Sequence, residues 1–384
     1  MHGPLMECGK VFTQREVFTH IFSSPRLRRK FYVIPDDVNP GIILYTTPKD
    51  AQEGVRHYAE LGVTIKYIAL YQGREPLDGN LPYPIIKEDE IIKYPECEIV
   101  LYRIDPKRYV DLPLAYRLAR LGIQCFLHTN IEVDPRDFGT FHYPNIIKNH
   151  RKAIVQLYNS LLDQDSRDAF AGYIKGRAVG STGYHRLAGF PEYHHPKCRV
   201  ENGDVVLEAG LEDGMTTIKL GKLVGEEGKV YGFEADPLNW ERIERNFKES
   251  GISDRLMLIK AGIWNERCVL PIICQGGSSS ITNNKENATL DVQLVTIDDF
   301  CTENAIQKVN VIKMDIEKAE MRALKGAVAT IQKNHPKLMI SVYHTRKHIF
   351  EIVDFINSLD CGYRYYIGCH TCNHTETDIY AVPQ

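Results

Sequence analysis

Residues 205–237 read VVLEAGLEDGMTTIKLGKLVGEEGKVYGFEADP, and this stretch decides the fold. An apolar run typical of a buried parallel strand ends in an acidic residue and is followed by Gly210 and Gly214. A helical stretch comes next, and a second apolar run over residues 229–233 ends in Glu234. Ligands of such α/β units bind beyond the carboxyl ends of the strands, so this order of elements predicts a cofactor-binding cleft.

The turn after the first expected strand differs from a dinucleotide-binding turn. Dinucleotide sites use G-x-G-x-x-G, whereas this chain has Glu208-x-Gly210-x-x-x-Gly214. Glu212 and Asp213 lie inside the turn, where their carboxylates would repel a pyrophosphate. The same two carboxylates are compatible with the sulfonium and ammonium groups of S-adenosylmethionine, which we therefore predict as the cofactor.

The predicted cofactor residues lie at or just beyond the ends of the expected strands. Glycines at positions 210 and 214 let the backbone come close to a ligand where a side chain would clash. The spacing from this turn to Glu234 is near the roughly 20 residues expected for a carboxylate that accepts hydrogen bonds from ribose hydroxyls. The set that we assign to the cofactor is Glu208, Gly210, Gly214, Thr216, Glu234, Ala261 and Gly262.

From residue 192 onward the chain carries blocks that resemble the FkbM family of class I methyltransferases. Beside the glycine turn, these blocks are EYHHP (192–196), GFEADP (232–237), TIDDF (296–300), VIKMDIEKAEMRALKGA (311–327), HPKLMISVYH (335–344) and TETDIYAVP (375–383). The resemblance implies O-methylation with S-adenosylmethionine as donor, on a hydroxyl of a small molecule such as a sugar or secondary metabolite. It does not identify the acceptor.

Three positions depart from the family pattern. Glu208 stands where the family usually has Asp, residues 212–214 read EDG where a turn with asparagine is more usual, and Lys318 replaces a Gly. These departures keep a second interpretation open, in which the chain is a catalytically inactive methyltransferase-fold protein that serves as a binding partner.

Two polar residues follow expected strands at the edge of the predicted cleft. Asp315 follows the apolar run 309–314, and His344 follows the run 338–343. Methyl transfer needs an acceptor oxygen held in line, and a general base can add roughly 10²–10⁴ in rate. Because histidine titrates nearest to neutral pH, we predict His344 as the base and Asp315 as the residue that orients it or the acceptor. Helix capping by Asp315 and a structural role for His344 are the alternatives.

The alternation of strands and helices predicts an α/β fold with two domains. Residues 191–384 should form a class I methyltransferase (Rossmann-like) sheet that ends in an antiparallel hairpin of strands 363–368 and 378–382. Met321, Leu324, Val328 and Ile331 repeat at helical spacing, which predicts helical structure over residues 321–331. A smaller Rossmann-like α/β domain should precede this sheet.

That smaller domain should comprise residues 1–149, with a first strand at 42–46 and a helix over 112–121. The turn after its first strand has no glycine that would admit a phosphate. We therefore expect acceptor recognition or dimerisation from this domain rather than nucleotide binding. Residues 150–190 should form a helical connector, with a lid over the acceptor in the stretch 180–189.

Composition excludes several classes of partner. The chain has 384 residues, 43% of them hydrophobic, with ten cysteines and a formal net charge of −3, which gives no electrostatic case for nucleic acid. No apolar stretch approaches the roughly 18–20 residues of a membrane span, and the N-terminus lacks the apolar core of a signal peptide. We expect a cytoplasmic protein with mostly free thiols; the oligomeric state stays open, with a homodimer as one option.

One cysteine cluster has the spacing of zinc ligands. Cys369 and Cys372 form a C-x-x-C motif, and His374 could add a third ligand. The chain has no second C-x-x-C motif or matched histidine pair, so we predict a loop here and no metal site.

Overall fold

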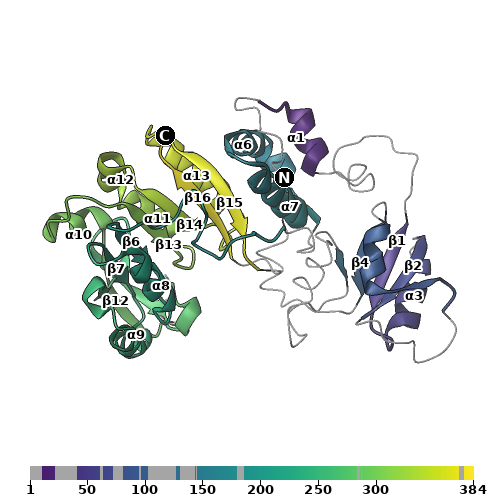
Figure 1. The fold of residues 1–384 in the computed structure, drawn as a ribbon, viewed down its shortest axis with the longest axis horizontal. Coiled ribbons are helices and arrows are strands. Elements are labelled where there is room, and N and C mark those ends of the chain that lie inside the picture. The colour runs from purple at the N-terminus through teal and green to yellow at the C-terminus, as the bar shows by residue number, and fades with distance from the viewer. Residues whose placement is uncertain are drawn as a thin grey trace. The chain divides into compact units, whose positions relative to one another are not determined.

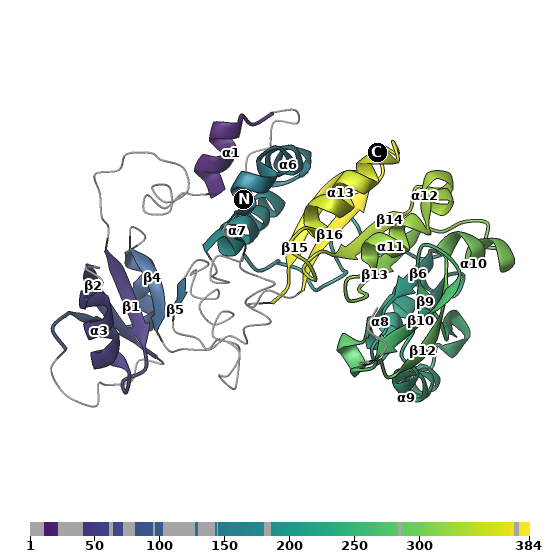
Figure 2. The same cartoon turned by 180° about the vertical axis from the view of Figure 1, so that it is seen from behind.

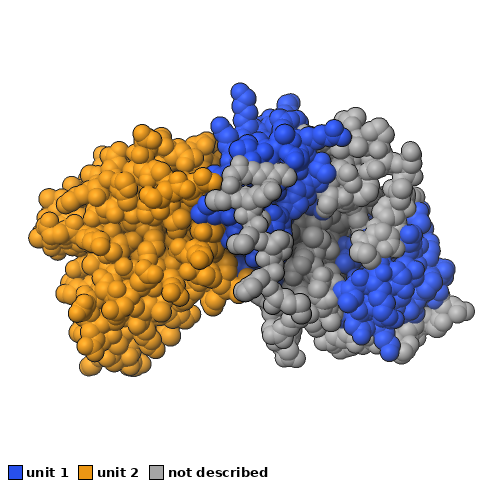
Figure 3. Space-filling model, turned by 45° about the horizontal axis from the view of Figure 1, so that its top comes forward, with its two compact units in different colours: residues 1–188, 369–375 blue, residues 189–368, 376–384 orange. Residues whose placement is uncertain are grey.

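The computed structural model of the chain describes residues 11–21, 41–60, 64–71, 81–94, 97–102, 127–129, 143, 145–179, 186–282, 286, 288–371 and 376–384. The chain divides into two compact units (Figure 3). Unit 1 comprises residues 1–188 and 369–375, and unit 2 comprises residues 189–368 and 376–384.

Unit 1 contains a five-stranded sheet in the order β3-β2-β1-β4-β5, and all its neighbouring strands are parallel (Figure 1). The strands are β1 Ile42–Thr46, β2 Ile65–Leu70, β3 Ile85–Ile86, β4 Glu98–Tyr102 and β5 Leu127–Thr129. Helix α3 (Ala51–Glu60) connects β1 to β2 and packs on both. This arrangement confirms the predicted Rossmann-like sheet, whereas the helix predicted over residues 112–121 lies outside the described residues.

Three further helices of unit 1 pack on one another: α1 (Gln14–Ile21), α6 (Ile146–Ser160) and α7 (Gln164–Val179). The last two fall largely within residues 150–190, for which we predict a helical connector. Asp163 starts the second of them because its carboxylate accepts from the Ser166 N–H at 2.7 Å. The predicted lid at residues 180–189 lies largely outside the described residues. In the part of the chain that the structure describes, no helix is long and apolar enough to cross a membrane.

Unit 2 is built on a seven-stranded sheet in the order β15-β16-β14-β13-β6-β7-β8 (Figures 1 and 2). Its strands are β6 Val205–Ala209, β7 Lys229–Phe233, β8 Leu256–Ile259, β13 Val311–Met314, β14 Lys337–Ser341, β15 Arg364–Cys369 and β16 Thr377–Val382. The five strands from β14 to β8 are parallel neighbours, and β16 runs antiparallel to β14. This is the predicted methyltransferase sheet with its antiparallel terminal strand.

The helices that connect these strands begin and end where local chemistry requires. They are α8 Met215–Val224, α9 Pro237–Glu249, α10 Ile297–Glu303, α11 Glu320–Lys325, α12 Val328–Asn334 and α13 His348–Ser358. Helix α9 starts at Pro237 because the Asp236 carboxylate accepts from the Leu238 N–H at 2.9 Å. The α8 and α9 helices pack together, as do α10 with α12 and α11 with α13.

The helical spacing over residues 321–331 is confirmed by α11 and α12, with an interruption at Gly326 that the spacing did not predict. A Cβ at this glycine would lie 2.1 Å from the Trp264 carbonyl oxygen, so the backbone at Gly326 packs too closely against the backbone at Trp264 for any other residue. The carboxylate of Asp298 then accepts from the N–H groups of Ala329 and Thr330 at 3.0 and 2.7 Å, which begins a new helix.

A second sheet in unit 2 was not predicted. It has the order β11-β10-β12-β9, with β9 Gly262–Ile263, β10 Cys268–Ile273, β11 Ser280–Ile281 and β12 Leu290–Val295 (Figure 2). Its apolar side chains pack with Ala235 and Trp264 in a small core of their own. The sequence signal for β12 is the alternation in LDVQLV. Val292 and Leu294 are buried, whereas Asp291 and Gln293 are exposed.

Candidate active site at the ends of β6, β7, β13 and β14

The turn between β6 and α8 depends on two glycines in the left-handed region. Gly210 has φ +83° and Gly214 has φ +78°. A Cβ at Gly210 would lie 1.8 Å from the carbonyl oxygen of Asp315, and one at Gly214 would lie 2.8 Å from the Phe247 ring. We predicted that a ligand would lie close to the backbone at these two glycines. In the structure, other residues of the protein occupy that space at both positions.

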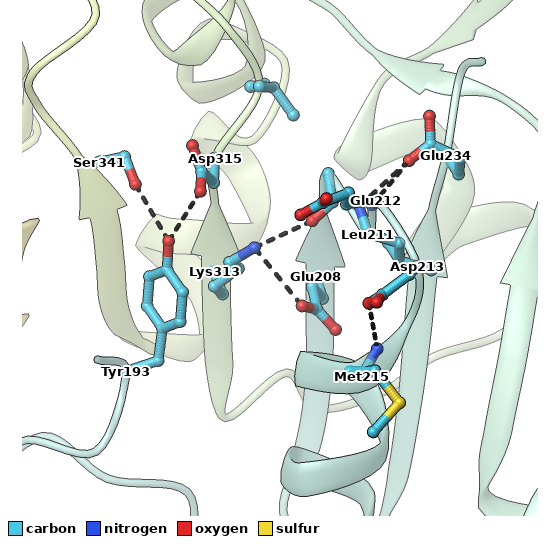
Figure 4. Close-up of polar contacts among 12 residues, drawn as sticks. Tyr193, Glu208, Leu211, Glu212, Asp213, Met215, Glu234, Lys313, Asp315 and Ser341 are labelled. Atoms are coloured by element: carbon cyan, nitrogen blue, oxygen red, sulfur yellow. Dashed lines mark hydrogen bonds and ion pairs between the residues drawn. The ribbon is translucent and has the colours of Figure 1, made fainter. Parts of the chain in front are cut away.

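Glu234, which follows β7, accepts hydrogen bonds from the backbone of this turn (Figure 4). One carboxylate oxygen accepts from the N–H groups of Leu211 and Glu212, both at 3.2 Å, and the other accepts from the Asp236 N–H at 2.8 Å. Burial raises the pKa of Glu234, although these N–H groups oppose the rise. Three of the roughly four acceptor positions of a carboxylate are thus in use, so a second ribose hydroxyl would have to replace one of the two longer hydrogen bonds.

The amino end of α8 is occupied by carboxylates. Asp213 accepts from the Met215 N–H at 2.9 Å, and Glu212 is exposed beside it with φ +55°. Thr216 is half-buried in the first turn of the helix. A pyrophosphate would need the free N–H groups of this helix end, so the arrangement disfavours a dinucleotide as the sequence predicts.

Glu208 and Lys313 form a buried ion pair beneath the turn (Figure 4). They are register partners on β6 and β13, with Lys313 Nζ 3.4 Å from the Glu208 carboxylate. Burial raises the pKa of Glu208, and the charge of Lys313 opposes that rise. Lys313 also donates to the Gly210 carbonyl at 2.9 Å, so the ion pair stabilises the turn between β6 and α8.

Ala261 and Gly262 lie just beyond β8, on the far side of Glu234 from the turn. The Glu234 N–H donates to the Ile259 carbonyl at 3.1 Å, which places the two strand ends side by side. Ala261 is buried, and a Cβ at Gly262 would lie 2.6 Å from Leu294. Both residues therefore help to join the large sheet to the small one.

Asp315, at the end of β13, is the centre of a second polar group. Tyr193 donates to its Oδ2 at 2.9 Å and Tyr343 donates to its Oδ1 at 3.3 Å. His344 Nε2 lies 3.3 Å from the same Oδ1, so the structure brings the two predicted catalytic residues together. About a quarter of the Asp315 side chain is exposed, at 24%. The carboxylate therefore remains accessible to a small molecule.

His344 is surrounded by acidic side chains. Its Nδ1 lies 2.8 Å from Glu320, and its Nε2 lies 3.6 Å from Glu317 in addition to Asp315. Burial alone would lower the pKa of His344, but the charge of Glu320 and the other carboxylates raise it well above its ordinary value. The imidazole therefore holds its proton at neutral pH, which does not suit the role of base.

Glu320 is the fully buried counterpart of two histidines. The His348 Nδ1 lies 3.3 Å from its second carboxylate oxygen, opposite His344. Burial would raise the pKa of Glu320, but the charge of His344 and contacts with both histidines hold it far below its usual range. Glu320 is thus ionised, and its charge stabilises the protonated state of His344.

Comparison with known proteins assigns this half of the chain. Residues 208–365 match the family model described as the Methyltransferase FkbM domain. Unit 2 contains an FkbM methyltransferase domain. The match begins at Glu208 and includes the glycine turn, Glu234, Asp315 and His344.

Two relatives extend this finding. The crystal structure of the methyltransferase FkbM of Methylobacillus flagellatus KT superposes with a TM-score of 0.58 at 18% identity, covering 96% of this chain and 100% of that chain. At that identity the likeness shows the fold. A Saccharolobus solfataricus protein named "Probable cobalt-precorrin-6B C(15)-methyltransferase (decarboxylating)" is 34% identical over 64 residues, 17% of this chain and 32% of that protein. The chain thus spans about a third of the length of this curated relative.

Among the described residues, two sets of three side chains in unit 2 offer ligand atoms within 4.8 Å of one another, and Asp315 belongs to both. One set adds Glu320 and His344, which already pair with each other. The other adds Glu192 and Glu376. Burial and the charges of Asp315 and Glu192 raise the pKa of Glu376 to about 9, so this carboxyl keeps its proton at neutral pH.

The predicted cysteine loop falls mostly outside the described residues, since Cys372 and His374 are both beyond them. Cys369 is buried at the end of β15 and forms no disulfide with another described cysteine. Lys318, which replaces a glycine of the family pattern, has φ +83° and an exposed side chain, so the backbone keeps the conformation that glycine favours.

Sequence reasoning missed Tyr193, Lys313 and Glu320 as parts of the site. Lys313 had a usable signal, because a charged residue inside the apolar run VIKM must find a buried partner. Glu320 lies five residues beyond Asp315, and Tyr193 lies in an irregular segment before the first strand of the FkbM domain. Neither position follows a periodic pattern that could have indicated it.

Proposed function

We propose that the FkbM domain binds S-adenosylmethionine at the turn between β6 and α8 and methylates a hydroxyl of a small molecule, such as a sugar or secondary metabolite. The match of residues 208–365 to the FkbM domain carries the proposal. The carboxylates at the amino end of α8 support it further, because they favour a cationic cofactor over a pyrophosphate.

S-adenosylmethionine, when bound, supplies an electrophilic methyl group on a sulfonium. The chain's part is to hold this group and the acceptor oxygen in line, which can supply most of the acceleration. Gly210, Gly214 and Glu234 would shape the cofactor side, with a second ribose hydroxyl replacing one of the 3.2 Å hydrogen bonds from Leu211 and Glu212. Thr216, Ala261 and Gly262 would border the same cleft.

On the acceptor side we propose that Asp315 faces the hydroxyl and that His344 is its protonated partner. As the new bond between the acceptor oxygen and the methyl carbon forms, the hydroxyl proton must leave, and Asp315 is the accessible carboxylate that can accept it. His344 cannot do so while the acidic side chains around it keep it charged. This reverses the two roles expected from sequence alone.

Unit 1 would recognise the acceptor or form a homodimer rather than bind a nucleotide. Its β1 is followed by a turn in which Thr47 donates to the Asp50 carboxylate at 2.5 Å and accepts from the Asp50 N–H at 3.2 Å. These two residues fill the amino end of α3, where a phosphate would need to bind. Unit 1 thus leaves cofactor binding to unit 2.

Calorimetry on the full chain with S-adenosylmethionine, S-adenosylhomocysteine and NAD tests the cofactor assignment. We expect saturable binding of the first two and none of NAD. Glu234→Gln should weaken S-adenosylhomocysteine binding by roughly 1.5–3 kcal/mol, because ribose hydroxyls lose a charged acceptor. Binding of NAD alone would contradict the proposal. Tight cofactor binding without methyl transfer to any acceptor would favour the inactive binding protein.

A further inference from the structure

A chain of hydrogen-bonding side chains runs away from Asp315 into the interior of unit 2. Figure 4 shows the part formed by Asp315, Tyr193 and Ser341. Tyr193 Oη donates to Asp315 Oδ2 at 2.9 Å and lies 3.2 Å from Ser341 Oγ. Ser341 Oγ in turn lies 2.8 Å from Asp378 Oδ1. Tyr193, Ser341 and Asp378 are all buried, so these contacts are shielded from bulk water.

Counting hydrogens fixes the direction of this chain. Three contacts join four oxygen atoms, and each hydrogen bond needs one hydrogen. Tyr193 and Ser341 supply one hydroxyl hydrogen each. If all three contacts are hydrogen bonds, the third hydrogen must lie on one of the terminal carboxyl groups, Asp315 or Asp378.

The surroundings of the two carboxyl groups differ in a way that decides between them. Asp378 is completely buried, whereas Asp315 is partly exposed and lies beside the charged His344. Burial and the charges of Glu192 and Asp315 raise the pKa of Asp378 well above its ordinary value. If the third hydrogen resides on Asp378, each group donates to the next in the order Asp378, Ser341, Tyr193, Asp315, and Ser341 accepts from Asp378 Oδ1 instead of donating to it.

Tyr193 has further contacts besides these, and one of its partners, Tyr380, also donates to Asp378 Oδ2 at 3.5 Å. Its backbone has φ +57°, an uncommon conformation for a residue with a Cβ, and its N–H donates to the Tyr380 hydroxyl at 3.2 Å. Its ring lies against Lys313, whose Nζ is 4.7 Å from the ring centroid. The hydroxyl is thus aimed at Asp315 by contacts additional to those of the hydrogen-bonded chain.

We propose that protonated Asp378, Ser341 and Tyr193 are positioning residues that hold the Asp315 side chain oriented toward the acceptor. The inference rests on the proposed function of Asp315. Because Ser341 donates to the Tyr193 hydroxyl oxygen, Tyr193 donates its own hydroxyl hydrogen to Asp315 Oδ2. The other oxygen is then left to His344, Tyr343 and the acceptor.

Four variants test the chain through turnover, with transfer of labelled methyl from S-adenosylmethionine to the acceptor that the wild-type protein uses. Tyr193→Phe and Ser341→Ala should lower turnover by about tenfold or more, with S-adenosylhomocysteine affinity within about twofold of wild type. Asp378→Ala should do the same. Asp378→Asn should keep turnover within about threefold of wild type, because its amide N–H replaces the carboxyl hydrogen.

Tyr365→Phe is the matched control, since it removes a buried hydroxyl that bonds to Asn357 at 2.6 Å and lies outside the chain. It should leave turnover unchanged. Wild-type turnover in Tyr193→Phe, or an Asp378→Asn variant as slow as Asp378→Ala, would overturn the inference. A wild-type protein that binds no S-adenosylmethionine and transfers no methyl group would instead overturn the proposed function and the role that rests on it.

An infrared measurement tests the position of the hydrogen without any acceptor. The difference spectrum of wild type minus Asp378→Asn at neutral pH should contain the C=O band of a protonated carboxyl group. Both proteins should carry Glu376→Gln, because the pKa of that neighbouring carboxyl group depends on Asp378 and its band could otherwise change. A band of an ionised carboxylate in its place would overturn the proposed direction of the chain.

Discussion

Lys313 on β13 and Glu208 on β6 face each other across two neighbouring strands, with Nζ 3.4 Å from the carboxylate and both side chains buried. The pair joins the two halves of the site, since Lys313 also donates to Gly210 and lies against the Tyr193 ring. The glutamate that departs from the family pattern therefore has a defined partner in this chain.

Removing one member of this pair should be more harmful than removing both charges. Lys313→Met leaves the Glu208 carboxylate buried without a counter-ion and should lower the free energy of unfolding by about 3–5 kcal/mol. The double variant Glu208→Gln with Lys313→Met should recover a large part of this loss. Urea denaturation followed by circular dichroism measures both, and equal destabilisation of the two variants would contradict the pairing.

Gly210→Ala should destabilise the fold as well as the site. The new Cβ would lie 1.8 Å from the Asp315 carbonyl oxygen, so β6 and β13 must move apart. Gly203→Ala is the matched control, because Gly203 has φ +82° and open space around it. That control should show only the roughly 1–2 kcal/mol of the left-handed conformation, and Gly210→Ala should exceed it in the same denaturation experiment.

Glu376 should make the protein less stable as pH rises. Its folded-state pKa is about 9 against an ordinary value of 4.5, so the folded chain holds the proton more tightly than the unfolded chain. Stability should therefore fall between about pH 4.5 and 9, by at most about 1.4 kcal/mol per pH unit. Glu376→Gln, which mimics the protonated group, should show a weaker decline, and an unchanged slope would rule this assignment out.

The pH dependence of turnover should reveal which residue accepts the proton. His344 has a raised pKa, so its charge and the contacts that depend on it are present near neutral pH and are lost as pH rises through the raised value. Turnover should not rise through the ordinary imidazole range.

Substitution of His344 tests the same assignment. His344→Gln should lower turnover about tenfold, because Asp315 loses a charged neighbour. His335→Asn changes an exposed histidine on a left-handed backbone that asparagine tolerates, and should have no effect. A wild-type rate that increases through the ordinary imidazole pKa would restore His344 as the base.

The parts of the fold that follow periodic patterns could be predicted from sequence. The apolar runs that became β6, β7 and β13 mark buried parallel strands, and Asp236 with Pro237 marks the start of α9. Asp315 and His344 could be brought together because parallel strands end at one edge of a sheet.

Side-chain partners could not be predicted in the same way. That His344 lies among carboxylates depends on Glu320, whose position is set by the short helix α11 rather than by a strand end. The glycines at 210 and 214 were expected from their spacing, but their true neighbours, Asp315 and Phe247, come from distant parts of the chain. Roles that depend on such neighbours need the structure.

Methyl transfer itself is the most direct test of the account. Full-length protein should be incubated with S-adenosylmethionine carrying a ¹³C-labelled methyl group and a panel of sugars and hydroxylated secondary metabolites, and the products examined by carbon NMR. We predict a new methyl signal on oxygen in at least one acceptor, greatly reduced in the Asp315→Asn variant. A methyl signal on nitrogen, or equal transfer by Asp315→Asn, would contradict the account.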